Sequence, residues 1–443
     1  MDIDFIVGFS LNMGMKILLV GGGGREHALA WKIVQSPLLE KLYCAPGNAG
    51  IAQLAECVAI DGEDLEAIKG FVLAKKIDLV VIGPEGPLVA GLADVLRDSG
   101  VDVFGPSKRA AAIEGSKSFM KGLFAKYNIP TAKYKVFTEP EGAMEYVREQ
   151  GAPIVVKTSG LAAGKGAIVC QTLDEALDAV KRLMLDREFG AAGDEVVVEE
   201  FLAGEELSFI AFVDGENVLP LAGSQDHKAV GEGDTGPNTG GMGAYSPASI
   251  LTVDLHQQVI DEVMIPTVAA MAAEGRPFKG VLYAGLMINN GELKVLEFNA
   301  RFGDPETQPL LMRMKSDIVP LMQASASGSL AGVEIEWDSR TALCVVLAAG
   351  GYPGSYAKGL PISGLEAAGD LEDVAVFHAG TKFDDLDAAQ VVTAGGRVLG
   401  VTALGDGVVA AQSLAYAAVD KISWDNSYCR RDIGYRAVAR GDK

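Results

Sequence analysis

The chain has 443 residues, more than one ordinary hydrophobic core accommodates, so about three domains are expected. Hydrophobic residues make up 49% and charged residues 22% of the chain, a balance that excludes disorder as its main state. The 38 Lys+Arg and 59 Asp+Glu residues give a net charge of −21, which would repel a nucleic-acid backbone and excludes a general nucleic-acid partner.

The N-terminal residues and the cysteines bear on location. Asp2 and Asp4 stand where a signal peptide would carry positive charge, and no apolar run approaches the roughly 18 to 20 residues that span a bilayer. The five cysteines are scattered without a CxxC pair, which favours reduced thiols over disulfides or a zinc site. We therefore expect a cytoplasmic protein with no membrane partner, in which residues 1–14 form a mobile extension.

From Met15 onward, short apolar segments alternate with helical ones, which predicts a parallel, Rossmann-like sheet with helices on both faces. Loops at 21–24, 46–48 and 83–87 follow its strands and should meet at the carboxyl edge, where such sheets bind ligands. The glycine turn at 21–24 could hold a phosphate, although a turn that only packs a helix on a strand remains an alternative. It lacks the third glycine of a dinucleotide motif, and this disfavours NAD.

A second glycine-rich loop occupies 160–166, directly after an apolar strand that ends at Lys157. Another strand follows, so the loop is a hairpin flap and not a Walker A loop. Lys157 and Lys117, which lies in a predicted helix, could supply positive charge to a polyphosphate beneath the flap. The alternative is a flexible turn with two solvated lysines. Thr172 followed by Glu175 predicts a helix after this hairpin.

An apolar strand beginning at Val196 ends in Glu199, Glu200, Phe201 and Leu202. Such a strand end could present its backbone to a purine edge, with Glu206 near the ribose hydroxyls. Taken alone, the pattern is equally typical of a solvated acidic strand end, and that interpretation is favoured until other motifs are considered.

The tract at 223–247 is rich in glycine and has no periodic apolar face, which predicts a long loop. It contains Asp226, His227 and Lys228, and its many polar groups could close over a small polar substrate. A disordered insertion is the alternative.

Asn290 and Gly291 separate two apolar strands, and this dipeptide predicts a hairpin. In the second strand, Glu297 and Asn299 share one face, with Cα atoms about 7 Å apart. A carboxylate and an amide oxygen at this spacing suit Mg²⁺ that is also bound to nucleotide phosphates. Arg301 follows and could bind a carboxylate or phosphate. An ordinary strand with a polar face remains the alternative.

Several long motifs in one order resemble the ATP-grasp superfamily, and within it the glycinamide ribonucleotide synthetases. The resemblance covers nearly all of residues 15–440 and departs from the family at Thr158 and Ser159, where the family usually has Ala-Asp. The motifs are GGGGREHALAW, APGNAG, GPEGPLVAG, EGSKSFMK, GLAAGKG, VEEFLAGEE, SQDHKAVGEGDTGPNTGGMGAYSP, EFNARFGDPETQ and AAGGYPG.

The resemblance implies an α/β and α+β multidomain fold. Its expected parts are a parallel domain at 15–116, an ATP-grasp domain at 117–335 with a mobile β-rich lid at about 135–203, and a small β-rich domain at 336–443. The implied activity is ATP-dependent ligation of glycine to 5-phosphoribosylamine through a glycyl phosphate, in purine biosynthesis. The implied cofactors are ATP and Mg²⁺, with Mn²⁺ as an alternative, and a monomer is favoured.

The resemblance also assigns roles to residues. Catalysis is assigned to Lys157, Asp226 and Arg301. Nucleotide binding is assigned to Lys117, Lys157, Gly160, Gly164, Lys165, Gly166, Glu199, Glu200, Phe201, Leu202 and Glu206. Substrate binding is assigned to Gly23, Gly24, Asn48, Glu85, Asp226, Lys228 and Arg301, and metal binding to Glu297 and Asn299.

Three other functions compete with this one. A related ligase could carboxylate an aminoimidazole ribonucleotide, and phosphate release with glycine or with bicarbonate would separate the two. A regulator that binds ATP without turnover is disfavoured, because Glu297, Asn299 and Arg301 are all present. An oxidoreductase would require tight NADH binding.

Overall fold

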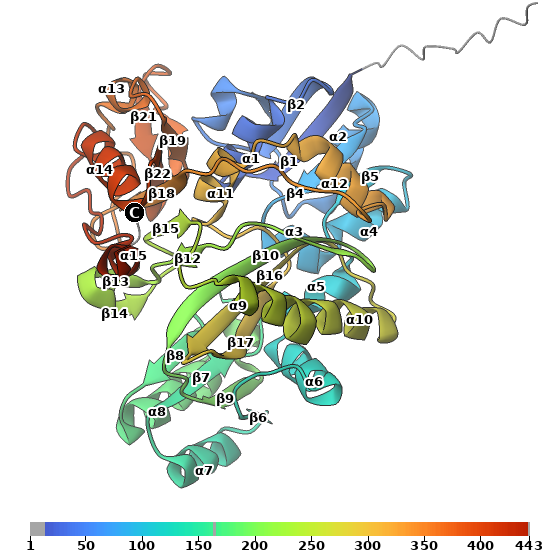
Figure 1. Cartoon of the computed structure of the whole chain (residues 1–443), viewed down its shortest axis with the longest axis vertical. Helices are drawn as coiled ribbons and strands as arrows, with labels where there is room; N and C mark the ends of the chain where they lie inside the picture. Colours follow the sequence, from blue (N-terminus) through green and yellow to red (C-terminus); the bar gives the residue numbers. More distant parts are fainter. Residues whose placement is uncertain (1–13, 163–164, 442–443) are drawn as a thin grey trace, which may run out of the picture.

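The computed structural model describes residues 14–162 and 165–441, so residues 1–13 of the predicted extension lie outside it. Figure 1 shows a parallel domain (blue), a central sheet, a lid sheet at the far end from that domain, and a C-terminal domain (red). Across the described ranges, no helix combines the length and the apolar character that a membrane span requires.

The N-terminal domain is built on a parallel sheet of order β3-β2-β1-β4-β5. Residues Ile17 to Val20 of its central strand are fully buried, and their side chains alternate between two hydrophobic cores. Both faces are therefore covered, which confirms the predicted class of sheet. The strands are β1 (Met15–Gly21), β2 (Leu39–Pro46), β3 (Glu56–Cys57), β4 (Leu79–Ile82) and β5 (Asp102–Phe104). The helices are α1 (Gly24–Ile33), α2 (Leu65–Lys75), α3 (Glu85–Ala90), α4 (Leu92–Arg97) and α5 (Lys108–Gly115).

The central sheet is antiparallel, in the order β11-β10-β16-β17. Asn290 and Gly291 both have positive φ (51° and 85°) between paired strands, so the predicted Asn-Gly hairpin is confirmed. Its strands are β10 (Glu205–Asp214), β11 (Val218–Pro220), β16 (Lys279–Asn289) and β17 (Glu292–Asn299). The helices of this part of the chain are α6 (Lys117–Tyr127), α9 (Val253–Val259), α10 (Ile265–Ala273), α11 (Thr307–Arg313) and α12 (Ile318–Ser327). Of these, α11 packs against α1 and against β18 and β22 of the C-terminal sheet.

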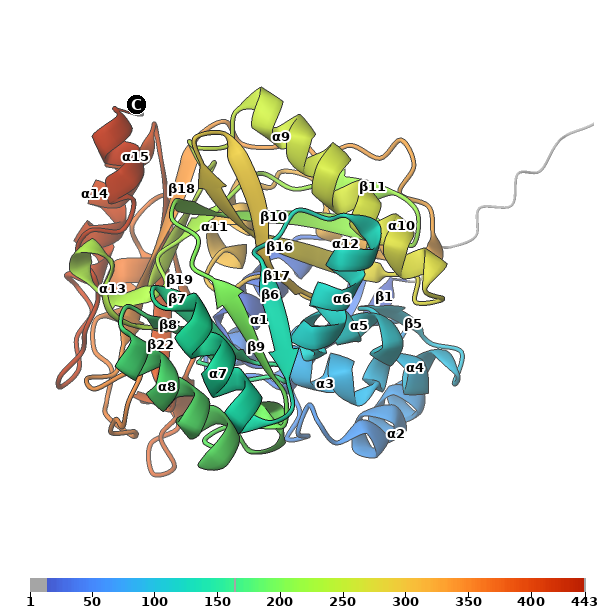
Figure 2. The same ribbon diagram turned by 90° about the horizontal axis from the view of Figure 1, so that it is seen from below.

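The lid is a separate antiparallel sheet of order β6-β9-β7-β8 with its own hydrophobic core. In the view from below, α7 and α8 lie side by side across this sheet (Figure 2). The flap hairpin between β7 and β8 is confirmed by their pairing. The strands are β6 (Tyr134–Phe137), β7 (Ile154–Thr158), β8 (Ala167–Cys170) and β9 (Val196–Glu200), and the helices are α7 (Pro140–Gln150) and α8 (Leu173–Val180).

Helix α8 begins with the predicted capping box. The Thr172 hydroxyl accepts from the Glu175 backbone N–H at 3.3 Å, and the Glu175 carboxylate accepts from the Thr172 N–H at 3.2 Å. We expect Thr172→Ala to destabilise the lid by about 1 kcal/mol, because it removes the acceptor for that Glu175 N–H. Faster amide exchange at the first turn of α8 would be the measured result, and Thr172→Ser should restore protection. Unchanged exchange in Thr172→Ala would contradict this expectation.

The C-terminal domain contains a five-stranded sheet of order β12-β15-β18-β22-β19. The predicted long loop at 223–247 is therefore wrong in part, since it holds four short strands and supplies two of them to this sheet. Strand β15 pairs with β18, about a hundred residues away, a partner that no local pattern reveals. The strands are β12 (Gln225–Asp226), β13 (Ala229–Gly231), β14 (Thr235–Asn238), β15 (Gly243–Ser246), β18 (Thr341–Ala348), β19 (Val374–His378), β20 (Thr381–Phe383), β21 (Val391–Thr393) and β22 (Arg397–Gly405). The helices are α13 (Leu365–Gly369), α14 (Val408–Val419) and α15 (Tyr435–Arg440).

Buried histidines make hydrogen bonds within the C-terminal domain and between it and the N-terminal domain. The backbone N–H of His378 donates to Nδ1 of His27 at 2.7 Å, and the backbone N–H of Gly434 donates to Nε2 of His227 at 3.1 Å. Burial lowers the pKa of His27 to about 3, with a further contribution from His378. Burial likewise lowers the pKa values of His227 and His378 to about 4. All three rings therefore remain neutral in the folded protein at neutral pH.

These shifts predict that the fold loses stability in mild acid. Below the unfolded pKa of about 6.5, the unfolded chain binds protons that the buried rings do not, so stability falls as the pH falls. Each ring should contribute a loss of about 2 kcal/mol between pH 7 and pH 5. Urea unfolding at a series of pH values would measure this loss, and His378→Asn should make the slope shallower. An identical slope in that variant would contradict the assignment.

Candidate active site

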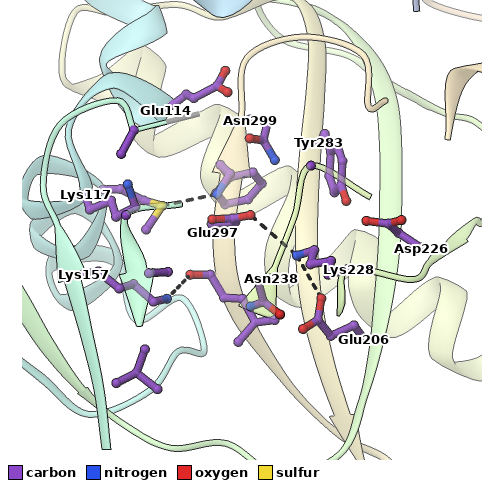
Figure 3. A pocket seen from close by; sticks show the side chains of 18 of the residues that line it. Glu114, Lys117, Lys157, Glu206, Asp226, Lys228, Asn238, Tyr283, Glu297 and Asn299 are labelled. Carbon is purple, nitrogen blue, oxygen red and sulfur yellow. Dashed lines mark hydrogen bonds and ion pairs between the residues drawn. The ribbon is translucent and has the colours of Figure 1, made fainter. Parts of the chain in front are cut away.

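A cavity of about 400 Å³ lies between the lid sheet and the central sheet. Its walls come from β7, β8 and β9 of the lid, from β16 and β17 of the central sheet, and from the segment that begins at β12 (Figure 3). The cavity therefore brings together groups that are distant in the sequence, among them Lys117, Lys157, Asp226 and Glu297.

Lys157 lies on the lid side of this cavity. Its Nζ is 3.1 Å from Oε2 of Glu199, because β7 and β9 are neighbours in the lid sheet. Lys121 approaches the same oxygen, also at 3.1 Å, but it is fully buried and does not line the cavity. The sequence analysis assigned no role to Lys121, although it belongs to the EGSKSFMK motif. Burial lowers the pKa of Lys121 to about 8, against the opposing effect of Glu199.

The start of the flap is tied to the first turn of α6. The backbone N–H of Lys117 donates to the Ser159 carbonyl at 2.8 Å, and its Nζ donates to the Gly160 carbonyl at 3.3 Å. Ser159 stands where the family usually has aspartate. Its hydroxyl accepts from the Ser118 backbone N–H at 3.1 Å and donates to the Ser118 hydroxyl at 3.0 Å. Gly166 leaves no room for a Cβ, which would lie 2.3 Å from the Thr158 hydroxyl.

Lys165, another flap residue, lies outside this cavity. The Lys165 ammonium donates to the Pro353 carbonyl at 3.0 Å and lines a second cavity, between the flap and the N-terminal domain. Gly164 falls outside the described residues.

Strand β17 supplies the predicted metal ligands. Burial alone would raise the pKa of Glu297, but Lys228, Lys157 and Lys117 lower it to about 2, so the carboxylate is ionised at neutral pH. The Asn299 Oδ1 accepts from Arg301 Nη2 at 3.1 Å. Both side chains line the cavity, as Figure 3 shows.

Arg301 is held by two carboxylates that come from other elements. Its guanidinium is 3.2 Å from Glu85 and 3.0 Å from Glu114. Burial opposes its charge, but these two acids outweigh burial and raise the pKa of Arg301. The Glu114 carboxylate also accepts from the Ala300 N–H at 2.7 Å, so it orients the end of β17 as well as the guanidinium.

Lys228 lies between Glu206 and Glu297, which were predicted to bind the ribose and the metal ion respectively. Its Nζ is 2.8 Å from Glu206, the predicted ribose contact, and 3.7 Å from Glu297. Asp226, two residues earlier on the same segment, lines the same cavity and is buried. Burial, followed by the nearby Glu306 carboxylate, raises the pKa of Asp226 well above its ordinary value.

The remaining predicted nucleotide residues also line the cavity. Oε1 of Glu200 accepts from the Lys294 ammonium at 3.1 Å and from the Lys133 backbone N–H at 3.0 Å, so this oxygen already has two donors within the protein. Phe201 and Leu202 follow it at the cavity wall.

Among the predicted substrate residues of the first domain, Glu85 lines both cavities, whereas Gly23, Gly24 and Asn48 line neither. The Asn48 side chain donates to the carbonyls of Gly22 and His378, at 2.9 Å and 2.8 Å, and so joins the first and last domains. The Gly23 N–H donates to Glu26 at 2.6 Å, and Gly24 begins α1. Substrate contact by these residues remains a prediction.

Several further residues that line the cavity had no predicted role. Five of them lie within the sequence motifs given above but had no role assigned, whereas Tyr283 and Arg397 lie outside those motifs. The residues are Arg25, Glu114, Asn238, Tyr283, Asp304, Glu306 and Arg397.

The residues present fit a divalent cation. Glu297 offers an ionised carboxylate and Asn299 an amide oxygen, the hard oxygen ligands that Mg²⁺ and similar ions take. Within the described ranges, no cluster of three or more acidic, histidine or cysteine side chains could hold an ion by itself. A cation here would complete its coordination with phosphate and water oxygens.

The lid, the central sheet and the lysine-lined and acid-lined walls between them define an ATP-grasp enzyme. Three family descriptions match the chain: "Phosphoribosylglycinamide synthetase" N domain at residues 15–114, ATP-grasp (A) domain at 115–307 and C domain at 342–436. The chain belongs to the phosphoribosylglycinamide synthetase family, as the sequence motifs had indicated.

Individual relatives agree with this assignment. A phosphoribosylamine–glycine ligase of Vibrio cholerae is 57% identical over 432 residues, covering 96% of this chain and 99% of its own. The crystal structure of the Thermotoga maritima phosphoribosylamine–glycine ligase superposes with a TM-score of 0.81 at 32% identity, covering 94% of this chain and 100% of its own. A biotin carboxylase from Campylobacter jejuni, with a TM-score of 0.73 at 14% identity, covers 94% of this chain and 93% of its own and shares the fold.

Proposed function

We propose that this protein ligates glycine to 5-phosphoribosylamine with ATP, giving glycinamide ribonucleotide, ADP and phosphate. The observation that carries the proposal is the single cavity in which Lys157, Glu297 and Arg301 converge. The family membership supports the choice of substrates over the carboxylating ligase, the regulator and the oxidoreductase.

The chemistry requires that the glycine carboxylate be activated, because a carboxylate does not acylate an amine in neutral water. Transfer of the γ-phosphoryl group of ATP would make a glycyl phosphate, which the amine of phosphoribosylamine then attacks to release phosphate. Such an intermediate hydrolyses in contact with water, and the flap of residues 160–166 offers a cover.

The chain's own groups would position and neutralise charge. Lys117 and Lys157 would contact the polyphosphate from the lid side, and the amides of the flap would lie over it. Lys228 would hold Glu206 and Glu297 in place, and Arg301, oriented by Glu85 and Glu114, would bind the glycine carboxylate. A divalent ion on Glu297 and Asn299 would supply further charge neutralisation at the phosphates.

Finer attributes belong to the same proposal. We take Mg²⁺ as the ion, with Mn²⁺ as a substitute, and a monomer as the working state. All five cysteines lie in the described ranges and are free thiols, which agrees with a reducing compartment such as the cytoplasm.

The test is a coupled assay of ADP release, with phosphoribosylamine generated in place. ADP release should require both glycine and phosphoribosylamine, and bicarbonate should not replace glycine. ADP release that ignores glycine would refute the proposal.

A further inference from the structure

Two buried carboxylates of the cavity lack the cation that each of its other acids has. The side chains of Asp226 and Glu306 belong to residues only 8% and 2% exposed, both line the cavity, and neither forms an ion pair with a described residue. The other cavity acids are paired as follows: Glu85 and Glu114 with Arg301, Glu199 with Lys157, Glu200 with Lys294, Glu206 and Glu297 with Lys228, and Asp304 with Arg397.

Both carboxylates retain unused acceptor capacity. Oε1 of Glu306 accepts from the Ser208 hydroxyl at 3.0 Å and the Tyr283 hydroxyl at 2.6 Å, while no donor in the described ranges reaches Oε2. Oδ1 of Asp226 accepts only from the adjacent His227 N–H, at 2.6 Å, and its Oδ2 has no donor among those residues. An ionised carboxylate has about four acceptor sites, so each group can still bind a donor from the cavity.

Asp226 lies beside the residue that precedes Glu306: a Cβ on Gly241 would be 2.4 Å from Cδ of Pro305 and 2.7 Å from Oδ1 of Asp226. Burial is the largest cause of the raised pKa of Asp226, and the charge of Glu306 is the second. The same two causes raise the pKa of Tyr283, and the charge of Asp226 adds to them. Figure 3 shows the Asp226 carboxylate beside the Tyr283 hydroxyl. Lys228 acts on Asp226, and Arg301 and Arg397 act on Glu306, but none of these cations forms an ion pair with either acid. Buried carboxylates without a paired cation are costly to ionise, and a cationic ligand placed between them would reduce that cost.

We propose that Asp226 and Glu306 form the subsite that binds the amino group of the glycine substrate as an ammonium ion. This inference rests on the proposed function. An ammonium group has three N–H donors, which match the free oxygens of the two acids. Arg301 would bind the carboxylate of the same glycine molecule. The charge of Glu306 acts on its guanidinium.

The subsite has a chemical consequence for the reaction. An ammonium ion has no lone pair, so glycine held in this form cannot attack a neighbouring acyl phosphate through its own nitrogen. The amine of the sugar would attack the acyl carbon instead, the phosphate would leave, and the attacking nitrogen would lose a proton.

Glu306→Gln and Asp226→Asn test this subsite, because each removes a charge while nearly preserving shape. Both should raise the KM for glycine by about 10- to 100-fold, the effect of a lost charge-assisted hydrogen bond, and leave the KM for ATP and phosphoribosylamine within about threefold. Ser208→Ala is the matched control, since it removes a donor to Glu306 and keeps the charge. Its KM for glycine should rise far less.

Acetate, which has the carboxylate of glycine and lacks the amino group, provides a second readout. In the unaltered enzyme, acetate should inhibit far more weakly than glycine binds. In Glu306→Gln, the affinities for glycine and for acetate should become similar, because glycine binding weakens and acetate binding does not. Calorimetry on the folded variant would measure both affinities. A KM for glycine that stays within about threefold in both variants would overturn the inference, as would a rise confined to phosphoribosylamine. Loss of glycine dependence in the unaltered enzyme would instead refute the proposed function.

Discussion

Replacement of Glu297 by glutamine is expected to lower kcat by at least about 100-fold while the protein stays folded. Charge neutralisation by a bound ion contributes several kcal/mol to such transition states, and each 1.36 kcal/mol corresponds to a tenfold change in rate. Glutamine preserves the shape of the side chain but not its charge, and Lys228 would still be paired with Glu206. Steady-state ADP release at saturating substrates, with circular dichroism as the check on folding, measures the effect.

Glu292 provides the control for this variant. It lies at the start of the same strand, its side chain is 72% exposed, and it is 3.8 Å from Lys294. Glu292→Gln should keep wild-type turnover, because surface pairs of this kind contribute little. Turnover of Glu297→Gln within about threefold of the parent would show that the metal assignment is wrong.

Lys157→Met is expected to raise the KM for ATP by about 10- to 100-fold, the cost of a lost charge-assisted hydrogen bond to a phosphate. Lys121→Met is its matched partner, because both lysines contact the same oxygen of Glu199 at the same distance. Of these two lysines, Lys157 lines the cavity and Lys121 does not. Lys121→Met should therefore change the KM for ATP little, and lower the free energy of unfolding by about 1 to 3 kcal/mol.

The two lysine variants are best compared in one experiment, with ATP titrations and urea unfolding on the same preparations. In each variant the other lysine still neutralises Glu199, so neither leaves that acid unpaired. Equal effects of the two substitutions on the KM for ATP would contradict the assignment of Lys157 to the nucleotide.

Local patterns were sufficient for much of the fold. The buried strand at Ile17, the capping box at Thr172 and the turn at Asn290 were all predicted, because each depends on neighbours within a few residues. The flap hairpin was predicted for the same reason, since its two strands are joined by the glycines themselves. The strands within 223–247 were missed, because each is only two to four residues long and the segment has no periodic apolar face. Strand β12 pairs with β15 and β13 pairs with β14 inside the segment, and only β15 also pairs with the distant β18.

The sequence by itself therefore determined the class of the fold, the family, and the identity of Lys157, Glu297 and Arg301 as candidate site residues. Only the tertiary structure decided which charges meet: Glu114 reaches Arg301 from another helix, and Glu306, from a distant segment, raises the pKa of Asp226. The physical reason is that helix and turn formation depend on residues nearby in the chain. Ion pairing and the absence of a counter-ion depend instead on which distant segments are packed around the same buried space.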